Sequence, residues 1–182
     1  MSEAELLVDC LHRLETVAID YMLVGSMAAN YWGVPRSTHD IYFVVEYDTS
    51  QVDAIVDAFQ GDFFIQSVSV ASGLRPPHQF NALHHASSLK VDFFRVAGDA
   101  YEFERFRRRK RVRLLGQDAW IATAEDVLLH KLRWYTITPS GRQLADARGI
   151  YLVSGSELDL PYLQYWAERI EVSDLLASVL RD

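Results

Sequence analysis

Two short segments of the sequence, residues 40–45 and 89–96, limit the possible folds most strongly, because apolar and polar side chains alternate along both. A period of two places successive side chains on opposite faces of a β-strand. Ile41 and Asp40 therefore fall on opposite faces of the first segment, as Val91 and Asp92 do in the second. Each segment is predicted to be a strand that buries one face and carries an acid on the other.

Apolar residues recur with helical spacing over much of the remaining chain. This pattern predicts helices at residues 3–17, 27–32, 51–60 and 101–108, and several more after residue 121. Further strands are predicted at residues 21–24 and 63–70, with a strand pair at 112–121. Capping residues expected to begin helices are Ser2 with Glu5, Thr123 with Asp126, Ser140 with Gln143, Asp159 and Ser173.

These elements predict an α/β (α+β) fold, in which a mixed β-sheet with flanking helices is followed by a C-terminal helical region. The expected domains are an α/β core at residues 1–121 and a helical region at residues 122–182 that packs on it. Sequential strands separated by helices are typical of such mixed architectures. We see no internal repeat and no segment of linker composition.

The composition is that of a globular protein and excludes several other classes. Of 182 residues, 49% are hydrophobic and the net charge is −7, so intrinsic disorder is not expected. The apolar runs have the length of strands, far below the ~20 residues of a membrane-spanning helix. An acidic N-terminus and a lone Cys10 beside leucines predict cytoplasmic residence, no membrane association and a buried thiol.

The dipeptide Gly25-Ser26, between a predicted strand and a predicted helix, suggests an anion-binding turn. A helix N-terminus presents unpaired backbone N–H groups and the positive end of the helix dipole, which suit a triphosphate. Carboxylates such as Asp40 and Asp92, projecting from neighbouring strands, would supply the oxygen ligands that Mg²⁺ prefers. Together these residues predict a nucleotide and metal site.

The ordered set of Leu23-Val24-Gly25-Ser26, Asp40-Ile41-Tyr42 and Lys90-Val91-Asp92 resembles the nucleotidyltransferase superfamily typified by DNA polymerase β. The likeness is strongest to the small bacterial AbiEii-type and minimal nucleotidyltransferases. It extends through residues 122–132, 140–146 and 158–163, so it covers nearly the whole chain. The resemblance implies a nucleotidyltransferase-like core and transfer of a nucleoside monophosphate from a nucleoside triphosphate (NTP) to a hydroxyl acceptor. It also implies Mg²⁺ or Mn²⁺ as cofactor and an RNA, protein or small-molecule acceptor.

One position departs from the family pattern, because Tyr42 stands where a second catalytic Asp is expected. A phenol has a reference pKa of about 10 and stays neutral at pH 7, so the site lacks one negative charge and one metal ligand. Glu46 is too far along the same strand to replace it. We therefore predict catalytic positions at Asp40, Tyr42 and Asp92, metal ligation by Asp40 and Asp92, and impaired transfer with nucleotide binding retained.

Nucleotide contacts are predicted at Arg36, Lys131 and Asp146, together with Gly25 and Ser26, and the resemblance implies that Lys131 reaches the triphosphate or Asp146. Each has a simpler structural explanation. Gly25-Ser26 could be a strand-to-helix turn with a capping serine, and Arg36 could pair with an acid. Lys131 could extend its ammonium to solvent along an apolar helix face, and Asp146 could form an ion pair with Lys131 or Arg142. Lys90 could likewise neutralise Asp92. These alternatives stay open from the sequence alone.

Seven of nine positions between Arg105 and Arg113 are basic. One interpretation is a nucleic-acid contact. The other, favoured by the acidity of the whole chain, is a helix C-terminus whose cations complement the dipole and cover acidic surface.

Because the carboxylate set is incomplete, an alternative function is a non-catalytic module that binds a nucleotide or a cognate toxin or antitoxin.

Overall fold

The computed structural model describes residues 1–181, which divide into two compact units. The first unit comprises residues 1–24 and 39–121, and the second comprises residues 25–38 and 122–182, of which the described part ends at residue 181. The predicted division at residues 121 and 122 differs from these units in the placement of residues 25–38. Whether residues 1–121 and 122–182 are the two domains of the chain stays a prediction.

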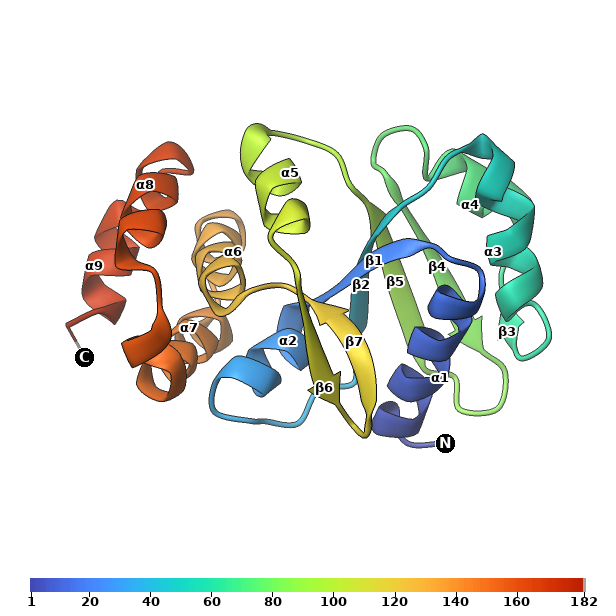
Figure 1. Cartoon of the computed structure of the whole chain (residues 1–182), viewed down its shortest axis with the longest axis horizontal. Helices are drawn as coiled ribbons and strands as arrows, with labels where there is room; N and C mark the ends of the chain where they lie inside the picture. The colour runs from blue at the N-terminus through green and yellow to red at the C-terminus, as the bar shows by residue number, and fades with distance from the viewer. Residues whose placement is uncertain (182) are drawn as a thin grey trace. The chain divides into compact units, whose positions relative to one another are not determined.

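The first unit is built on a mixed sheet of seven strands in the described chain, ordered β3-β4-β5-β2-β1-β7-β6 (Figure 1). The strands β1 and β2 are antiparallel, whereas β2 and β5 are parallel neighbours. The strands are β1 (Asp20–Val24), β2 (Ile41–Glu46), β3 (Phe63–Phe64), β4 (Gln79–His84), β5 (Lys90–Arg95), β6 (Lys110–Leu114) and β7 (Gln117–Ile121). The helices of this unit are α1 (Glu3–Thr16), α3 (Val52–Phe59), α4 (Ser67–Ser72) and α5 (Ala100–Arg107), with a 3-10 turn at Thr49–Gln51.

One face of this sheet carries an aromatic core. Phe93 stacks on Phe43 and Phe80 with ring centroids 5.7 and 4.8 Å apart, and Phe59 of α3 meets Phe93 edge-on at 5.5 Å. These rings are 0–4% exposed, and they lie on the apolar side of the alternation predicted for residues 40–45 and 89–96. The opposite face of β2 and β5 is thereby the one that carries Tyr42 and Asp92.

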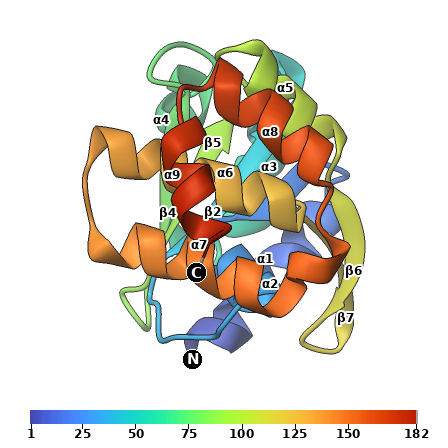
Figure 2. The same cartoon turned by 90° about the vertical axis from the view of Figure 1, so that its left-hand side faces the viewer.

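The helical elements of the second unit are α2 (Gly25–Trp32), α6 (Ala124–Ile137), α7 (Gly141–Ser154), α8 (Leu160–Arg169) and α9 (Ser173–Val179), with a 3-10 turn at Gly155–Glu157 (Figure 2). Two hydrogen bonds of Trp32 explain why residues 25–38 belong to this unit. Its indole Nε1 donates to the Ala122 carbonyl at 2.8 Å, and its carbonyl accepts from the Ser154 hydroxyl at 2.6 Å. The segment is thus joined to both ends of the α6–α7 pair.

The predicted mixed α/β class is confirmed, and so are most local signals. The Ser2–Glu5 capping box is present, and the Thr123 and Asp159 side chains cap α6 and α8. Ser140 caps α7 by accepting from the N–H of Arg142, but the box predicted with Gln143 is wrong, because Gln143 Oε1 accepts no hydrogen bond within residues 1–181. Cys10 is fully buried, and burial raises the pKa of its thiol. No helix within residues 1–181 combines the length and apolar character needed to cross a bilayer.

The strand predicted at residues 63–70 is wrong. Only Phe63 and Phe64 pair in a strand, and α4 begins at Ser67. The buried residues Phe63 and Val70 are seven positions apart. Side chains an odd number of positions apart lie on opposite faces of a strand, so a single strand could not bury both on one face. Val68, between them, is 77% exposed. The sequence interpretation also missed β4, whose buried positions alternate as Phe80, Ala82 and His84 but include only one large apolar residue.

Close backbone packing in the second unit gives a testable consequence at Gly33. A Cβ atom there would lie 2.8 Å from the Ile150 nitrogen and 2.9 Å from the Gly149 carbonyl carbon, both backbone atoms that cannot rotate away. We expect Gly33→Ala to lower the free energy of unfolding by about 1–3 kcal/mol in urea titrations. Gly141→Ala, where nothing lies within 4 Å of the new atom, is the control and should be neutral or slightly stabilising. Equal stability of the two variants would contradict this account.

Candidate functional site

The second unit contains a polar cluster at the first turn of α2. Gly25 begins the helix with φ of +69°, a left-handed conformation that glycine adopts at little cost. Ser26 follows and is 8% exposed. The first backbone N–H groups of a helix have no partner within the helix, so this turn offers hydrogen-bond donors and the positive end of the dipole.

Two cationic side chains converge on the Ser26 hydroxyl. Nη2 of Arg36 donates to Ser26 Oγ at 2.9 Å, and Nζ of Lys131 donates to the same oxygen at 3.4 Å. The carboxylate of Asp146 holds both cations: Arg36 binds it through Nε and Nη2 at 2.7 and 2.8 Å, and Lys131 binds it at 2.7 Å. We call Ser26, Arg36, Lys131 and Asp146 the α2 cluster.

The α2 cluster is largely buried, which strengthens its electrostatic interactions. The side chains of Lys131 and Asp146 are 9% and 5% exposed, whereas that of Arg36 is 31% exposed. Burial lowers the pKa of Lys131, and the contact with Asp146 only partly offsets this effect. Burial alone would raise the pKa of Asp146, but hydrogen bonds from Arg36 and Lys131 outweigh it, so its pKa is lowered. Asp146 is therefore ionised at neutral pH.

Asn30 of α2 fixes the backbone that carries Arg36. Its Nδ2 donates to the Arg36 carbonyl at 2.7 Å, and its Oδ1 accepts from the Arg36 N–H at 3.0 Å. This pair of bonds ties the loop after α2 back onto the helix. Sequence reasoning missed this positioning role, for which the only signal was an Asn six residues before the arginine.

The first unit brings together the predicted acids. The register of the parallel strands β2 and β5 sets Tyr42 directly beside Asp92, and the strand alternation places Asp40 on the same face of the sheet. Lys90 lies at 3.0 Å from the Asp92 carboxylate, so the alternative ion pair considered for Asp92 is present. The Tyr42 phenol is hydrogen-bonded to Asp40.

Tyr42 remains neutral in this position. Burial raises the pKa of its hydroxyl, and the nearby charges of Asp40 and Asp92 raise it further. A neutral phenol that is hydrogen-bonded to one acid, beside a second acid paired with Lys90, is a poor set of donors for two magnesium ions, which demand several anionic oxygens. Within residues 1–181 no three His, Cys, Asp or Glu side chains gather to hold a metal ion. These residues do not fit a two-metal centre, and Mg²⁺ or Mn²⁺ at Asp40 and Asp92 stays a prediction.

The predicted site residues thus form two groups. One group consists of Ser26, Arg36, Lys131 and Asp146, which are linked by hydrogen bonds in the second unit. Gly25 directly precedes Ser26 in the sequence. Asp40, Tyr42 and Asp92 share one sheet face in the first unit. The Gly25-Ser26 turn belongs to one unit and the acids to the other. That the turn faces the acids therefore stays a prediction.

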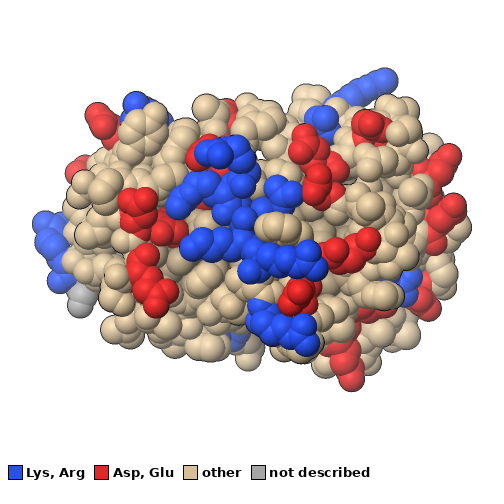
Figure 3. All heavy atoms as spheres, viewed as in Figure 1, with Lys and Arg blue, Asp and Glu red and all other residues tan. Residues whose placement is uncertain are grey.

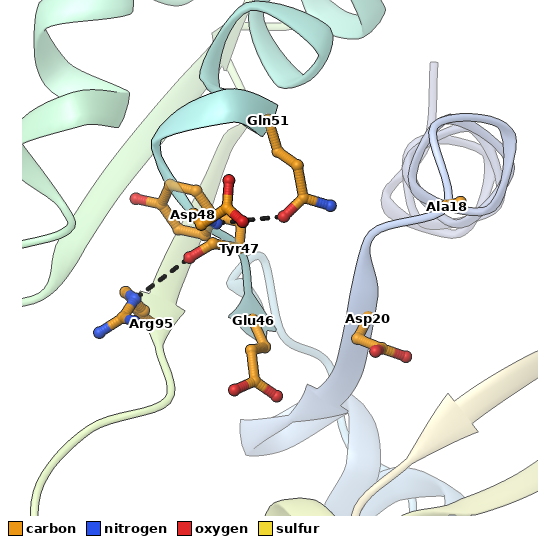
Figure 4. Close-up of a pocket in the computed structure, with 7 residues that line it drawn as sticks. All are labelled: Ala18, Asp20, Glu46, Tyr47, Asp48, Gln51 and Arg95. Carbon is orange, nitrogen blue, oxygen red and sulfur yellow. Dashed lines mark hydrogen bonds between the residues drawn. The ribbon is translucent and has the colours of Figure 1, made fainter.

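A separate polar pocket lies at the opposite end of β2 (Figure 4). Asp20 and Glu46 are register partners on β1 and β2 at its rim. Its other polar groups are largely satisfied within the chain, since Arg95 donates to the Tyr47 carbonyl at 3.3 Å and Asp48 caps the following turn. As predicted, Glu46 belongs to this end of the strand, four positions beyond Tyr42.

Comparison with known proteins supports the fold. No family model matches the chain, and no curated protein is detectably similar in sequence. Among solved structures, an antigenic nucleotidyltransferase-like protein from Paracoccidioides brasiliensis is 19% identical with a TM-score of 0.56, and the match covers 98% of this chain and 92% of that one.

The antibiotic-resistance factor ANT(2'')-Ia is matched in two structures at 13% identity. Its solution structure gives a TM-score of 0.58, covering 99% of this chain and 98% of that one. Its crystal structure in complex with adenylyl-2''-tobramycin gives 0.55, with coverage of 98% and 97%. The chain therefore has a nucleotidyltransferase-like fold.

Proposed function

We propose that this protein binds the triphosphate of a nucleotide at the α2 cluster. The observation that carries the proposal is the convergence of Arg36 and Lys131 on Ser26, at 2.9 and 3.4 Å from its hydroxyl oxygen, in the first turn of a helix. Guanidinium, ammonium, hydroxyl and helix-terminal N–H groups are the donors that proteins use for phosphate oxygens. Asp146 holds the two cations in place before any ligand arrives.

The nucleotidyltransferase-like fold supports a nucleotide as the source of that phosphate. A protein of this fold, ANT(2'')-Ia, has been crystallised with adenylyl-2''-tobramycin, which is an adenylylated compound. We infer that a nucleoside triphosphate is the ligand of the present chain. The finer likeness to AbiEii-type and minimal nucleotidyltransferases is part of this proposal.

We further infer that transfer of the nucleoside monophosphate is impaired. The family reaction depends on metal ions bridged by carboxylates, and this chain offers a neutral Tyr42 hydroxyl between Asp40 and Asp92. A neutral phenol lacks the negative charge with which a carboxylate bridges two cations. The protein is thus proposed to be a nucleotide-binding member of the fold with an incomplete catalytic set.

Calorimetric titration tests the binding proposal. Each of ATP, GTP, CTP and UTP is titrated into the full chain, and inorganic tripolyphosphate is used as a competitor that lacks base and sugar. We expect binding of at least one nucleotide, displaced by tripolyphosphate. In Arg36→Gln we expect affinity to fall by about tenfold to a hundredfold, because a charge-assisted hydrogen bond is worth about 1.5–3 kcal/mol.

Arg169→Gln is the matched control, because it removes an arginine from α8 in the same unit whose side chain covers Tyr165 instead of the α2 cluster. It should bind as tightly as the unchanged protein. Circular dichroism at the titration temperature verifies that both variants are folded. Nucleotide binding that is unaltered by Arg36→Gln would refute the proposed site, and no binding of any of the four nucleotides would refute the function.

A further inference from the structure

A basic surface of the first unit plays no part in the nucleotide proposal. Seven cationic residues occupy the end of α5 and the strand β6, and Figure 3 shows Lys and Arg side chains gathered in a band across the middle of that view. We call them the basic band, whose members are Arg105, Arg107, Arg108, Arg109, Lys110, Arg111 and Arg113.

The helix dipole explains only part of the basic band. Arg105 and Arg107 lie in the last turn of α5, where cations complement the carbonyl end of a helix, and each is paired with a glutamate of that helix. Lys110, Arg111 and Arg113 lie beyond the helix, on β6. Their concentration on one strand therefore requires another reason.

The strand β6 is well placed to contact a partner. Within residues 1–181 it is the last strand in the sheet order and pairs with β7 alone, so one of its edges has no strand partner there. Arg111 and Arg113 are 52% and 70% exposed, and because they are two residues apart their side chains leave the same face of the strand, about 6.6 Å apart. Lys110 is also exposed, and by the same alternation its side chain leaves the opposite face.

The local carboxylates neutralise this strand incompletely. Asp118 is shared by Arg111 at 3.5 Å and Arg113 at 3.3 Å, and its own side chain is 52% exposed. Exposed ion pairs at these distances contribute little free energy, so a stronger anion can replace Asp118 as the partner of these arginines. Lys110 takes part in no ion pair within residues 1–181.

Trp120 contacts two arginines of the band. It is the register partner of Arg111 on β7, and the guanidinium carbons of Arg109 and Arg111 lie 5.1 and 5.9 Å from its ring centroid. Such cation–π contacts restrict the arginine side chains before a ligand binds. Less conformational entropy is then lost on binding.

From this geometry we propose that the basic band binds the phosphodiester backbone of a nucleic acid, through Arg111 and Arg113. Two exposed guanidinium groups on one strand face match successive phosphates of a nucleic-acid strand, each of which can accept two parallel hydrogen bonds from one arginine. No base-reading groups are involved, so the contact is independent of nucleotide sequence. Trp120 acts as a positioning residue.

Fluorescence anisotropy with labelled 20-nucleotide single-stranded RNA and with a labelled 20-base-pair DNA duplex tests this proposal. Two phosphate contacts predict that log K falls with log salt at a slope of about −1.4 for the single strand and about −1.8 for the duplex. The Kd for RNA should therefore rise about sevenfold between 50 and 200 mM salt. The comparison of the two probes tells which form the band prefers.

Variants separate the charge contacts from the positioning role. Arg111→Ser combined with Arg113→Ser should bring the slope for RNA close to zero and raise the Kd at least about tenfold. The control combines Arg75→Ser with Arg181→Ser, which removes the same charge from exposed arginines outside the band and should leave the slope unchanged. Trp120→Leu should weaken binding several-fold at an unchanged slope, and Trp120→Phe should restore most of the affinity.

The absence of RNA and DNA binding at 50 mM salt would overturn the proposal, and so would an equal loss of affinity in the control double variant. Displacement of RNA by polyglutamate at equal charge concentration would also overturn it, because it would indicate an acidic protein partner instead. Thermal melting verifies that each variant is folded. Nucleotide titrations on the Arg111/Arg113 double variant should match those of the unchanged protein, so this proposal and the nucleotide site can fail independently.

Discussion

Replacing Asp146 by asparagine is expected to lower the free energy of unfolding by about 3–5 kcal/mol. The Asp146 side chain is 5% exposed and holds the 9%-exposed ammonium of Lys131 at 2.7 Å together with Arg36. Asparagine has nearly the same size, so the change removes charge while leaving the packing intact. Two cations that were brought together by one carboxylate would then repel each other in a site with little water. Urea titration followed by circular dichroism measures the loss.

The matched control for this change is Asp118→Asn. Asp118 also serves two cationic side chains, Arg111 and Arg113, but it is 52% exposed and its contacts are 3.5 and 3.3 Å long. Water and salt screen such pairs, so the expected loss is below about 1 kcal/mol. A second comparison is Lys131→Met, which leaves Asp146 paired with Arg36 and should cost less than Asp146→Asn. Similar losses at Asp146 and Asp118 would show that burial does not strengthen the α2 cluster.

The dependence on pH gives an independent measurement of the same interaction. Because the pKa of Asp146 is lowered by folding from its ordinary value of 3.8, its ionised form stabilises the protein at pH values above that number. This stabilisation decreases as the pH falls through the lowered pKa, because the carboxyl group takes up a proton. The difference in unfolding free energy between the unchanged protein and Asp146→Asn should therefore be constant from pH 5 to pH 7 and shrink below about pH 4.

Local sequence signals predicted the elements that depend on neighbouring residues. The caps at Ser2, Thr123 and Asp159 were identified correctly because a capping side chain bonds within three residues of itself. The alternation around Ile41 and Val91 predicted two strands with one buried face, and both are present as parallel neighbours. The alternation itself did not indicate that these two strands would adjoin.

Long-range contacts could not be derived from the sequence. The Arg36–Asp146 pair joins residues 110 positions apart, and neither the loop of Arg36 nor the helix of Asp146 contains a local signal for the other. The sequence offered Lys131 and Arg142 as partners of Asp146, and Lys131 is one of them while Arg36 is the other. The short helix α4 was missed for a different reason. Its single buried residue, Val70, gives no periodic pattern from which a helix could be predicted.

Tyr42→Asp is expected to produce the largest functional change. It would add a third carboxylate beside Asp92 on the same face of β2 and β5 that carries Asp40, and it would remove the phenol that is hydrogen-bonded to Asp40. Three carboxylates on one face repel one another until a divalent cation binds. We therefore expect the melting temperature to fall without Mg²⁺ and to recover when Mg²⁺ is added, with Mg²⁺ affinity raised at least about tenfold.

Activity should follow the metal site if the proposed function is correct. With α-labelled nucleoside triphosphate and Mg²⁺, Tyr42→Asp should transfer label to an acceptor, or to water, at a rate at least about a hundredfold above that of the unchanged protein. Tyr42→Asn and Tyr42→Phe are the controls: the first has the size of aspartate without its charge, and the second keeps the ring but loses the hydroxyl. Neither should gain Mg²⁺ affinity or activity.

The same set of variants distinguishes a protein that has lost only one metal ligand from a protein whose fold serves binding and not transfer. If Tyr42→Asp binds Mg²⁺ but transfers nothing while nucleotide titrations still show binding, the carboxylates can be completed without restoring chemistry, and the α2 cluster serves binding alone. If Tyr42→Asp gains neither metal nor activity, the face shared by Asp40 and Asp92 is not a latent metal site, because Lys90 at 3.0 Å from Asp92 already supplies the cation that this carboxylate needs.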